Sequence, residues 1–502
     1  MTSDDIESGD EMLSSTMASI ERWLGNPLTR ALLGWFTSDC KTCGSRFDVA
    51  LDRFTGQRDI SPCPSCLLAS WLVGLTIRRS GKIFGVSDDL LKEGLHAPYL
   101  RRGLSTVVRG IARYGITRPQ KVNAPFLIVW DITHRCNLRC AHCYQDARKA
   151  LPGVLNTEEA KKVLDELAAA GVVAIAFSGG EPLMRPDIRD IIRYAKEKSF
   201  FVSLASNGTL IDDALAGELV ALGLDYIEIS LDAANAAHHD SFRGVHGAFD
   251  RTVAGIRACV RAGIDTGIAT TVTARTVDQV PAIHALAASL GVNRMMCFNF
   301  VPTGRGVEMV DQDITPDQRE ALHKWILEMD HSGKNPVILS TAPQFARVAV
   351  EEEGGGGIPV AHFYAGNGLE GKTAALAEFI GGCGAGRIYC SIEPEGTVQP
   401  CVFLPISVGN LRNATFEEIW HNSEVFVRLR SRDDLQGNCG ECRNRLLCGG
   451  CRARAYAYFG DIKAMDPGCI RNKKYRNSLP RKAETPPPPT RDQKGMGVSP
   501  RM

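Results

Sequence analysis

Three closely spaced cysteines, Cys136, Cys140 and Cys143, are the residues of this chain best suited to chemistry. They follow a Cys-x3-Cys-x2-Cys pattern, and the aromatic Tyr144 comes directly after the last thiol. A cubane [4Fe–4S] cluster normally takes four Cys thiolates. Three ligands with no fourth nearby would leave one iron open, which distinguishes a chemically active metal site from a structural one. The alternative is three ordinary buried thiols, because free Cys is among the most buried residue types.

This spacing, with the aromatic residue after it, resembles the signature of the radical S-adenosylmethionine (SAM) superfamily. The resemblance implies that Cys136, Cys140 and Cys143 hold a [4Fe–4S] cluster and that SAM binds its open iron, next to Tyr144. It also implies an enzyme, in which an electron from the cluster cleaves SAM to methionine and a 5′-deoxyadenosyl radical. That radical would then remove a hydrogen atom from a substrate.

A second motif, Gly179-Gly180-Glu181-Pro182, follows Ser178. Glycine lets the backbone approach a ligand closely. The motif resembles the family's GGEP segment, which implies that these four residues lie along the SAM amino group. Without the preceding cysteine motif, a Gly-Gly pair would indicate no more than a turn.

Short polar residues follow two later strand-like runs, with Ser206 and Asn207 after one and Ser230 and Asp232 after the next. Such side chains reach a ribose or a carboxylate, although each commonly serves as a turn former or a helix cap. Arg243 matches an arginine that in relatives grips the SAM carboxylate, and guanidinium groups suit carboxylates. An ordinary surface arginine is the alternative for Arg243.

Strands and helices alternate through the region that carries these motifs. The expected strands are 126–132, 172–177, 201–206, 226–230, 265–272 and 294–300, and the expected helices are 156–170, 187–198, 212–222, 250–262 and 277–290. Such β–α units in succession predict an α/β fold with a parallel sheet. The family resemblance selects a partial (βα)6 TIM-like barrel. In such barrels the chemistry lies at the carboxyl ends of the strands, where the motifs fall.

Eight more cysteines lie near the C-terminus, enough for two sets of four. Their register resembles the SPASM extension of radical SAM enzymes and implies two auxiliary [4Fe–4S] clusters. The implied ligands are Cys383, Cys390, Cys401 and Cys451 for the inner cluster, and Cys439, Cys442, Cys448 and Cys469 for the outer one. If Cys390 is not a ligand, the inner cluster has an open iron. A pair of zinc knuckles is the rival interpretation.

Four cysteines in the front part form two Cys-x2-Cys pairs, Cys40 with Cys43 and Cys63 with Cys66. Two such pairs at this separation indicate a four-thiolate metal site. A short segment that cannot build its own core needs a staple of this kind. Zinc is the commoner occupant, mononuclear iron of the rubredoxin type is the alternative, and we expect no catalytic role.

Composition limits the class of protein further. A net charge of +1 over 502 residues argues against nucleic acid as a partner. The acidic, polar N-terminus does not resemble a secretory signal, so the 17 cysteines indicate metal ligation in a reducing cytoplasm. Residues 100–113 combine an apolar stripe at helical spacing with arginines off that stripe. This pattern predicts a surface helix packed on the barrel, with peripheral membrane contact as the alternative.

These patterns divide the chain into six segments. We expect a polar tail and helix at 1–39, a four-cysteine zinc-ribbon or rubredoxin-like module with a basic helical region at 40–121, the barrel at 122–306, an insertion or cap at 307–380, the SPASM domain at 381–475 and a disordered Pro-rich tail at 476–502.

Together these features predict a cytoplasmic radical SAM/SPASM oxidoreductase from an anaerobic setting, reduced by a donor such as ferredoxin or flavodoxin. SPASM relatives modify peptides, proteins and tetrapyrroles, and we rank a peptide or protein substrate first, a tetrapyrrole second and a lipid third. Val402 follows Cys401 where sulfatase-maturing relatives carry an acid, which disfavours sulfatase oxidation. A non-catalytic Fe–S or zinc protein, acting as an electron carrier or scaffold, is the alternative from another class.

Overall fold

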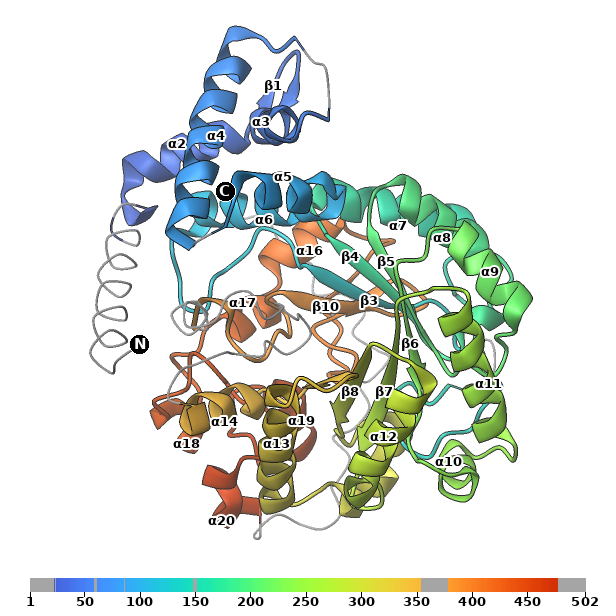
Figure 1. Ribbon diagram of the computed structural model, residues 1–502. Helices are drawn as coiled ribbons and strands as arrows, with labels where there is room; N and C mark the ends of the chain where they lie inside the picture. Colours follow the sequence, from blue (N-terminus) through green and yellow to red (C-terminus); the bar gives the residue numbers. More distant parts are fainter. Residues whose placement is uncertain are drawn as a thin grey trace.

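The computed structural model describes residues 22, 24–57, 61–84, 86–147, 151–353 and 378–476. Residues 1–21 of the polar tail and helix predicted at 1–39, residues 477–502 of the Pro-rich tail predicted at 476–502, and the Gly-rich residues 354–377 of the 307–380 segment lie outside these residues. An α/β barrel forms the body of the molecule, the N-terminal module is a separate lobe at one end of it, and the Cys-rich C-terminal region lies beside it (Figure 1).

A 10-stranded sheet curves to form the barrel, in the order β12-β11-β10-β3-β4-β5-β6-β7-β8-β9. From β10 to β9 neighbouring strands are parallel, which confirms the predicted α/β class. The strands are β3 (Leu127–Asp131), β4 (Ala174–Ser178), β5 (Phe201–Ser206), β6 (Tyr226–Ser230), β7 (Thr266–Val272), β8 (Arg294–Asn299), β9 (Val337–Ser340), β10 (Tyr389–Ile392), β11 (Thr397–Gln399) and β12 (Gly409–Asn410). Strands β9 and β10, which the sequence patterns did not predict, extend the expected six-stranded core on either side.

Helices cover the outer face of the sheet (Figure 1). They are α7 (Thr157–Ala170), α8 (Ile188–Glu197), α9 (Asp213–Ala221), α10 (Ala236–Arg243), α11 (Ala248–Arg261), α12 (Val280–Leu290) and α13 (Pro316–His331). Helix α7 begins with the predicted capping box: Glu159 N donates to Asn156 Oδ1 at 2.9 Å, and Asn156 N donates to the Glu159 carboxylate at 2.8 Å.

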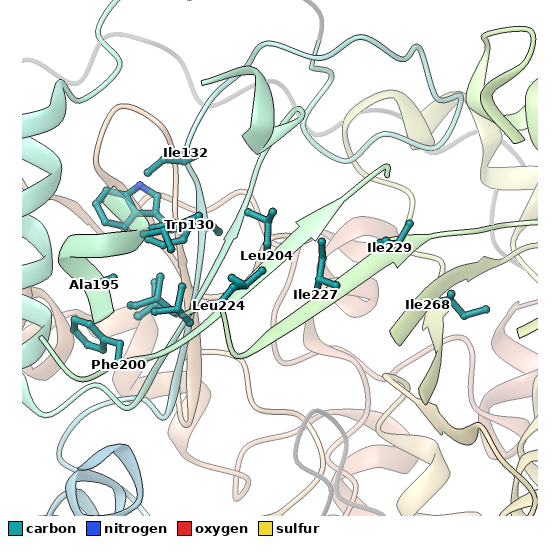
Figure 2. Packing of buried hydrophobic residues seen from close by; sticks show 14 of the residues in the cluster. Trp130, Ile132, Ala195, Phe200, Leu204, Leu224, Ile227, Ile229 and Ile268 are labelled. Carbon is teal, nitrogen blue, oxygen red and sulfur yellow. The ribbon is translucent and has the colours of Figure 1, made fainter. Parts of the chain in front are cut away.

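The main hydrophobic core lies between this outer face and the helices. Trp130, Leu204, Ile227, Ile229 and Ile268 are all fully buried there (Figure 2). They occupy alternate positions of their strands, because successive side chains of a strand point to opposite faces. The remaining positions face the inside of the barrel, which we call the lumen.

The N-terminal module comprises helices and one short hairpin. Its elements are α2 (Pro27–Thr37), β1 (Asp39–Cys40), β2 (Gly44–Ser45), α3 (Arg46–Thr55), α4 (Pro64–Phe84), α5 (Asp88–His96) and α6 (Pro98–Tyr114). Helix α6 is the predicted basic helix, and it packs on the barrel, where Arg102 donates to the carbonyls of Val172 at 3.1 Å and Lys198 at 2.6 Å. None of the helices described is both long and apolar enough to cross a membrane.

The described part of the segment predicted as an insertion or cap, 307–380, continues the barrel instead of covering it. After the 3-10 helix η3 (Gly304–Gln312), α13 and β9 continue the barrel, and α14 (Gln344–Glu353) follows. Ile338 and Leu339 of strand β9 are buried. The strand was not predicted because it is too short to show a clear alternation of apolar and polar residues. The Cys-rich region then contributes short helices, α16 (Phe416–Asn422), α17 (Glu424–Arg430), α18 (Gly437–Glu441), α19 (Arg452–Phe459), η5 (Ile470–Asn472) and α20 (Lys473–Arg476).

Candidate active site

The loop after β3 brings Cys136, Cys140 and Cys143 to one end of a cavity of about 650 Å³ inside the barrel. Leu138 N donates to Cys136 Sγ at 3.4 Å, and Arg243 Nη1 donates to Cys140 Sγ at 3.6 Å. Hydrogen bonds to sulfur of this kind tune Fe–S sites. The three predicted ligands therefore face one space and have donors that favour thiolates.

The spacing of these thiols suits a multi-iron cluster better than a single ion. A tetrahedral Zn–S bond of about 2.3 Å holds sulfur atoms about 3.8 Å apart. Across the described residues, the one set of potential ligand atoms lying within 4.8 Å of one another is in the N-terminal module. At least two of the Cys136, Cys140 and Cys143 sulfurs are therefore more than 4.8 Å apart, which suits a cubane better than a single ion.

The Gly179–Gly180 turn packs directly against the start of the cysteine loop. Gly180 N donates to the Thr133 carbonyl at 2.7 Å, and Gly179 has a φ of +123°. A Cβ atom on Gly180 would lie 2.1 Å from the Arg135 carbonyl oxygen. Both residues line the cavity, and glycine is needed because there is no room for a side chain between the two loops.

Glu181 is fully buried behind this turn and does not line the cavity. Its carboxylate accepts hydrogen bonds from Ser206 Oγ at 2.9 Å and Asn207 N at 2.8 Å. Burial raises the pKa of Glu181 to about 7, although these hydrogen bonds oppose the shift. Glu181 therefore joins the β4 and β5 turns, and Pro182 is buried beside it at the start of η1 (Pro182–Met184). Direct contact of either residue with SAM stays a prediction.

Ser206, Asn207, Ser230 and Arg243 line the cavity, as their positions at strand ends and after β6 suggested. Arg243 is 7% exposed, so it is not the surface arginine of the alternative interpretation. Its Nε donates to Asp232 Oδ2 at 2.6 Å. Burial alone would raise the pKa of Asp232, but the Arg243 guanidinium outweighs it, and the pKa is lowered. Asp232 therefore holds Arg243 in place rather than facing the cavity itself.

His142 is a cavity residue that the sequence analysis did not single out, although it lies inside the cysteine motif. Its ring stacks on Phe242 with centroids 4.2 Å apart, and its Nδ1 has no hydrogen-bond partner in the protein. Burial lowers the pKa of His142 to about 3, so the imidazole is neutral. A neutral aromatic ring with one free polar atom suits the adenine of SAM.

Asp131 was also not predicted, although it ends β3. It is buried and accepts hydrogen bonds from Tyr144 Oη at 2.8 Å and Gln145 Nε2 at 2.5 Å. Burial raises the pKa of Asp131 to about 7. The Tyr144 hydroxyl is thus bound to the protein, and its ring meets Phe403 edge-on at 5.3 Å. The structure supports a positioning role for Tyr144, and its contact with SAM stays a prediction.

The outer set of auxiliary cysteines lies together. Cys439, Cys442, Cys448 and Cys469 line one small cavity. Donors surround it: Asp466 N lies 3.4 Å from Cys439 Sγ, Gly450 N 3.3 Å from Cys448 Sγ, and Arg471 Nη1 3.2 Å from Cys442 Sγ. The donor set fits an Fe–S cluster with four thiolate ligands.

The inner set is divided between two places. Cys383, Cys401 and Cys451 line the main cavity together with the Cys136 loop. Cys390 is fully buried in β10 and pairs with Ile128, a residue of the outer core. Its neighbour Tyr389 lines the cavity, so alternation turns the Cys390 side chain to the opposite face. This geometry disfavours the predicted role of Cys390 as a ligand, because the sheet separates its thiol from the other three.

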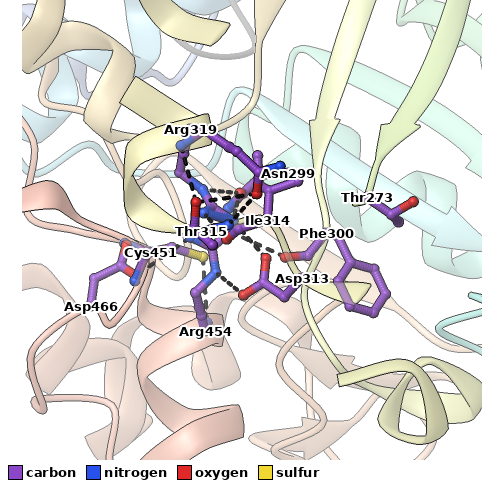
Figure 3. Close-up of polar contacts among 12 residues, drawn as sticks. Thr273, Asn299, Phe300, Asp313, Ile314, Thr315, Arg319, Cys451, Arg454 and Asp466 are labelled. Atoms are coloured by element: carbon purple, nitrogen blue, oxygen red, sulfur yellow. Dashed lines mark hydrogen bonds and ion pairs between the residues drawn. The ribbon is translucent and has the colours of Figure 1, made fainter. Parts of the chain in front are cut away.

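A buried charge network connects Cys451 to the barrel (Figure 3). The Arg454 guanidinium lies 3.8 Å from Asp313 and 3.6 Å from Asp466, and it donates to the Phe300 carbonyl at 3.1 Å. Asp466 in turn accepts the Cys451 amide hydrogen at 2.7 Å. The inner auxiliary cysteines are therefore fixed relative to the end of β8.

The comparisons with known proteins agree with this site. The model of the radical SAM superfamily matches residues 130–287, and that of an iron–sulfur cluster-binding domain named SPASM matches residues 383–443. The chain belongs to the radical SAM superfamily and carries a C-terminal SPASM domain, so it is a radical SAM enzyme.

The chain is similar in sequence to two characterised enzymes and in fold to a solved structure. The chain is 40% identical to an AdoMet-dependent heme synthase of Methanosarcina barkeri, over 69% of this chain and 97% of that protein. It is 31% identical to the mycofactocin maturase MftC of Mycobacterium tuberculosis, over 75% and 91% respectively. A crystal structure of Streptococcus suis SuiB bound to S-adenosylmethionine shares the fold, with a TM-score of 0.57, 17% identity and 81% and 90% coverage.

Proposed function

We propose that this enzyme cleaves SAM at the end of the cavity lined by Cys136, Cys140 and Cys143, and that it abstracts hydrogen from a tetrapyrrole in the lumen. The bound cluster would supply the electron and SAM the radical. The residues of the chain would bind both reactants, orient them and exclude water. This choice reverses the first two ranks of the sequence analysis, which placed a peptide or protein before a tetrapyrrole.

The observation that carries the proposal is a hollow barrel. Closed (βα)8 barrels normally fill their interior with layers of bulky branched side chains. Here the lining includes Ala174, Ala176, Ser203, Ala205 and Ala269, at lumen-facing positions of β4, β5 and β7, whereas β6, between β5 and β7, contributes Tyr226 and Glu228. Small side chains at these positions leave room for a broad, flat ligand beside SAM.

The chemistry of the walls also supports a tetrapyrrole. Phe201, Met296 and Phe298 line the cavity and offer apolar surface to a conjugated macrocycle. Arg243 lines the cysteine end, and Arg294 lines the end where the strands begin. A carboxylate side chain, which natural porphyrins carry, would find the Arg294 guanidinium there, beside its partner Asp265 at 2.6 Å, whereas Arg243 is assigned to the SAM carboxylate.

Sequence similarity favours the same substrate class. Identity to the heme synthase is 40%, against 31% to the mycofactocin maturase. Since both relatives are matched over most of their length, the difference supports a tetrapyrrole over a peptide for this chain.

We infer further that the inner auxiliary cluster has three protein ligands, Cys383, Cys401 and Cys451. Because Cys390 points away, one iron would be open toward the cavity and could accept an electron from the substrate radical or bind the substrate itself. We expect Cys390→Ala to keep the iron content of the wild type after anaerobic reconstitution, whereas Cys401→Ala loses a cluster. Equal iron loss in both variants would restore Cys390 as a ligand.

The direct test is anaerobic incubation with SAM, dithionite and Fe-coproporphyrin III, a porphyrin with propionate side chains. We expect 5′-deoxyadenosine to form faster with the porphyrin and the porphyrin mass to change. In Ala176→Leu, which fills the lumen, porphyrin turnover should fall more than about tenfold, because a pocket clash of this size costs over about 1.4 kcal/mol. Ala221→Leu, on the exposed end of α9, is the matched control. Porphyrin left unchanged, with a peptide of the cell extract modified instead, would contradict the proposal.

A further inference from the structure

The four cysteines of the N-terminal module converge from two elements. Cys40 lies in β1 and Cys43 in the turn to β2, where Gly44 has a φ of +84° that favours glycine. Cys63 immediately precedes α4, and Cys66 lies in its first turn. A tight hairpin thus faces the beginning of a helix, and each contributes two thiols.

The geometry fits one metal ion. The four Sγ atoms lie within 4.8 Å of one another, and Cys40 Sγ and Cys63 Sγ are 3.5 Å apart. This spacing is close to the sulfur separation of about 3.8 Å in a tetrahedral four-thiolate zinc site. A closed set of four cysteines, with no open position, is typical of a structural ion rather than a catalytic one.

The module needs such an ion because its own core is small. The buried residues of its hydrophobic cluster are Phe36, Phe47, Ala50, Leu51, Ala69 and Val73. Three of these lie on α3 and two on α4, and Cys66 itself is fully buried in the first turn of α4. A core of this size supplies little stability without a staple.

Helix α6 connects this core to the barrel. On the module side, Ser105 Oγ donates to Asp48 Oδ1 of α3 at 2.6 Å. On the barrel side, Thr106 Oγ1 donates to the Gly171 carbonyl at 2.7 Å, and the Arg102 guanidinium lies 4.8 Å from the Phe200 ring centre. Gly110 packs so closely that a Cβ would lie 2.6 Å from the Lys121 carbonyl oxygen.

The first turn of α6 forms part of the cavity wall. Tyr99 and Leu100 line the same cavity as the cysteine loop, at the end where Phe201 and Tyr226 begin their strands. The Tyr99 ring meets Phe201 edge-on at 5.3 Å. The cavity therefore extends along the strands from the SAM-binding end to the N-terminal module.

The geometry points to a new metal site with a structural role. Cys40, Cys43, Cys63 and Cys66 hold one zinc ion, and this ion fixes α6 as the far wall of the substrate cavity. The wall's contact with substrate rests on the proposed function, but the zinc site and its effect on α6 do not. Both family models begin after this module, at residue 130 or later, so the module is an addition to the matched domains.

The metal part is tested by elemental analysis of the full-length, cluster-loaded protein. We expect one zinc per chain in the wild type and none in the double variant Cys43→Ser/Cys66→Ser, with cluster iron retained. Cys259→Ala, a fully buried cysteine in α11, is the matched control and should keep the zinc. Loss of one iron instead of one zinc would overturn the zinc assignment.

The claim that the zinc ion fixes α6 is tested by hydrogen–deuterium exchange on wild-type protein before and after zinc removal with a chelator. Exchange of residues 98–114 should rise at least about tenfold when zinc is removed, because the helix then opens locally. Exchange of residues 280–290 in α12 should not change. Equal protection of 98–114 with and without zinc would overturn the link between the ion and α6.

A titration with Fe-coproporphyrin III tests the role of the wall in binding. Leu100→Trp should weaken binding about tenfold, whereas Leu90→Trp, at a 58% exposed position of α5, should not. If the wild type itself binds no porphyrin, the proposed substrate fails while the zinc count and the exchange data still decide the metal site. Tight porphyrin binding by both variants would overturn Leu100 as part of the binding wall.

Discussion

Arg243 and Asp232 form a buried ion pair at the cysteine end of the cavity. The guanidinium is buried, bonded to Asp232 and within 3.6 Å of Cys140 Sγ. A positive charge there stabilises thiolate ligands and lies where a carboxylate of SAM would bind.

Arg243→Ala should reduce 5′-deoxyadenosine formation by at least about tenfold, because it removes this cation and leaves the Asp232 carboxylate buried. The rate is measured by chromatography after anaerobic reconstitution, at matched iron content. Arg251→Ala, an exposed position on the neighbouring α11, serves as control and should retain the rate. Full activity of the Arg243 variant would show that another group holds SAM.

Glu228 provides a pH test of the lumen. Burial raises its pKa from 4.5 to about 7, although Tyr226 and Arg294 oppose the shift. Because the pKa of Glu228 is higher in the folded state than in the unfolded state, ionisation of this group favours unfolding. Its contribution to the free energy of unfolding is fully present below pH 4.5 and is lost as the pH rises through 7. Glu228→Gln should therefore remove up to about 3 kcal/mol of pH dependence between about pH 5 and pH 8.

Denaturant unfolding at these two pH values measures the effect of Glu228→Gln. Glu328→Gln, an exposed position on α13, is the control and should unfold like the wild type at both. Identical pH dependence in the Glu228 variant and the wild type would mean that this carboxyl is solvated.

Many individual residues of the site could be predicted from the sequence. Ser206, Asn207 and Ser230 reach the cavity because strand ends in a parallel barrel share one edge. The face taken by Cys390 was not predictable, because the short strand Tyr389–Ile392 is buried on both sides and shows no alternation. His142 could have been found from its place between two ligands.

At the scale of elements, the turn after β4 is a tightly constrained connection. The Gly180 position touches the Arg135 carbonyl so closely that any side chain displaces the cysteine loop. Gly180→Ala should therefore lower cluster occupancy and reduce SAM cleavage by more than about tenfold.

Iron analysis and the rate of 5′-deoxyadenosine formation measure the effect of Gly180→Ala. The matched control is Gly217→Ala in α9, where a new Cβ has no atom within 4 Å. That change should raise stability by up to about 1 kcal/mol, because alanine favours the helix. Wild-type iron content and rate in Gly180→Ala would contradict this account of the turn.

The strands β3 to β8 were predictable because each combines an apolar run with a following helix of clear periodicity. Strands β9 and β10 were not predicted, since four residues each carry too little pattern. Their places depend on pairing with β8 and β3 across the fold.

For the whole molecule, the Arg454 network joins the SPASM domain to the barrel. Arg454 is fully buried and lies between Asp313 and Asp466. Arg454→Met should destabilise the protein by about 3–5 kcal/mol, because it removes the cation from a buried group of charges. It should also loosen Cys451, and iron content should fall by one cluster.

Thermal unfolding and iron analysis measure both effects of Arg454→Met. Arg443→Met, whose side chain is 74% exposed, is the control and should change neither quantity. An Arg454 variant as stable as the wild type would mean that the two domains dock without this charge. No sequence pattern pointed to the network, because Phe300 and Arg454 lie 154 positions apart in the chain.

The central claim is that Cys136, Cys140 and Cys143 leave one iron of their cluster open to SAM. It is tested most directly by electron paramagnetic resonance of the dithionite-reduced protein with and without SAM. We expect SAM to change the signal of one cluster in the wild type, and we expect Cys140→Ala to show neither the change nor 5′-deoxyadenosine. A wild-type signal that SAM leaves unchanged, or product from Cys140→Ala, would contradict it.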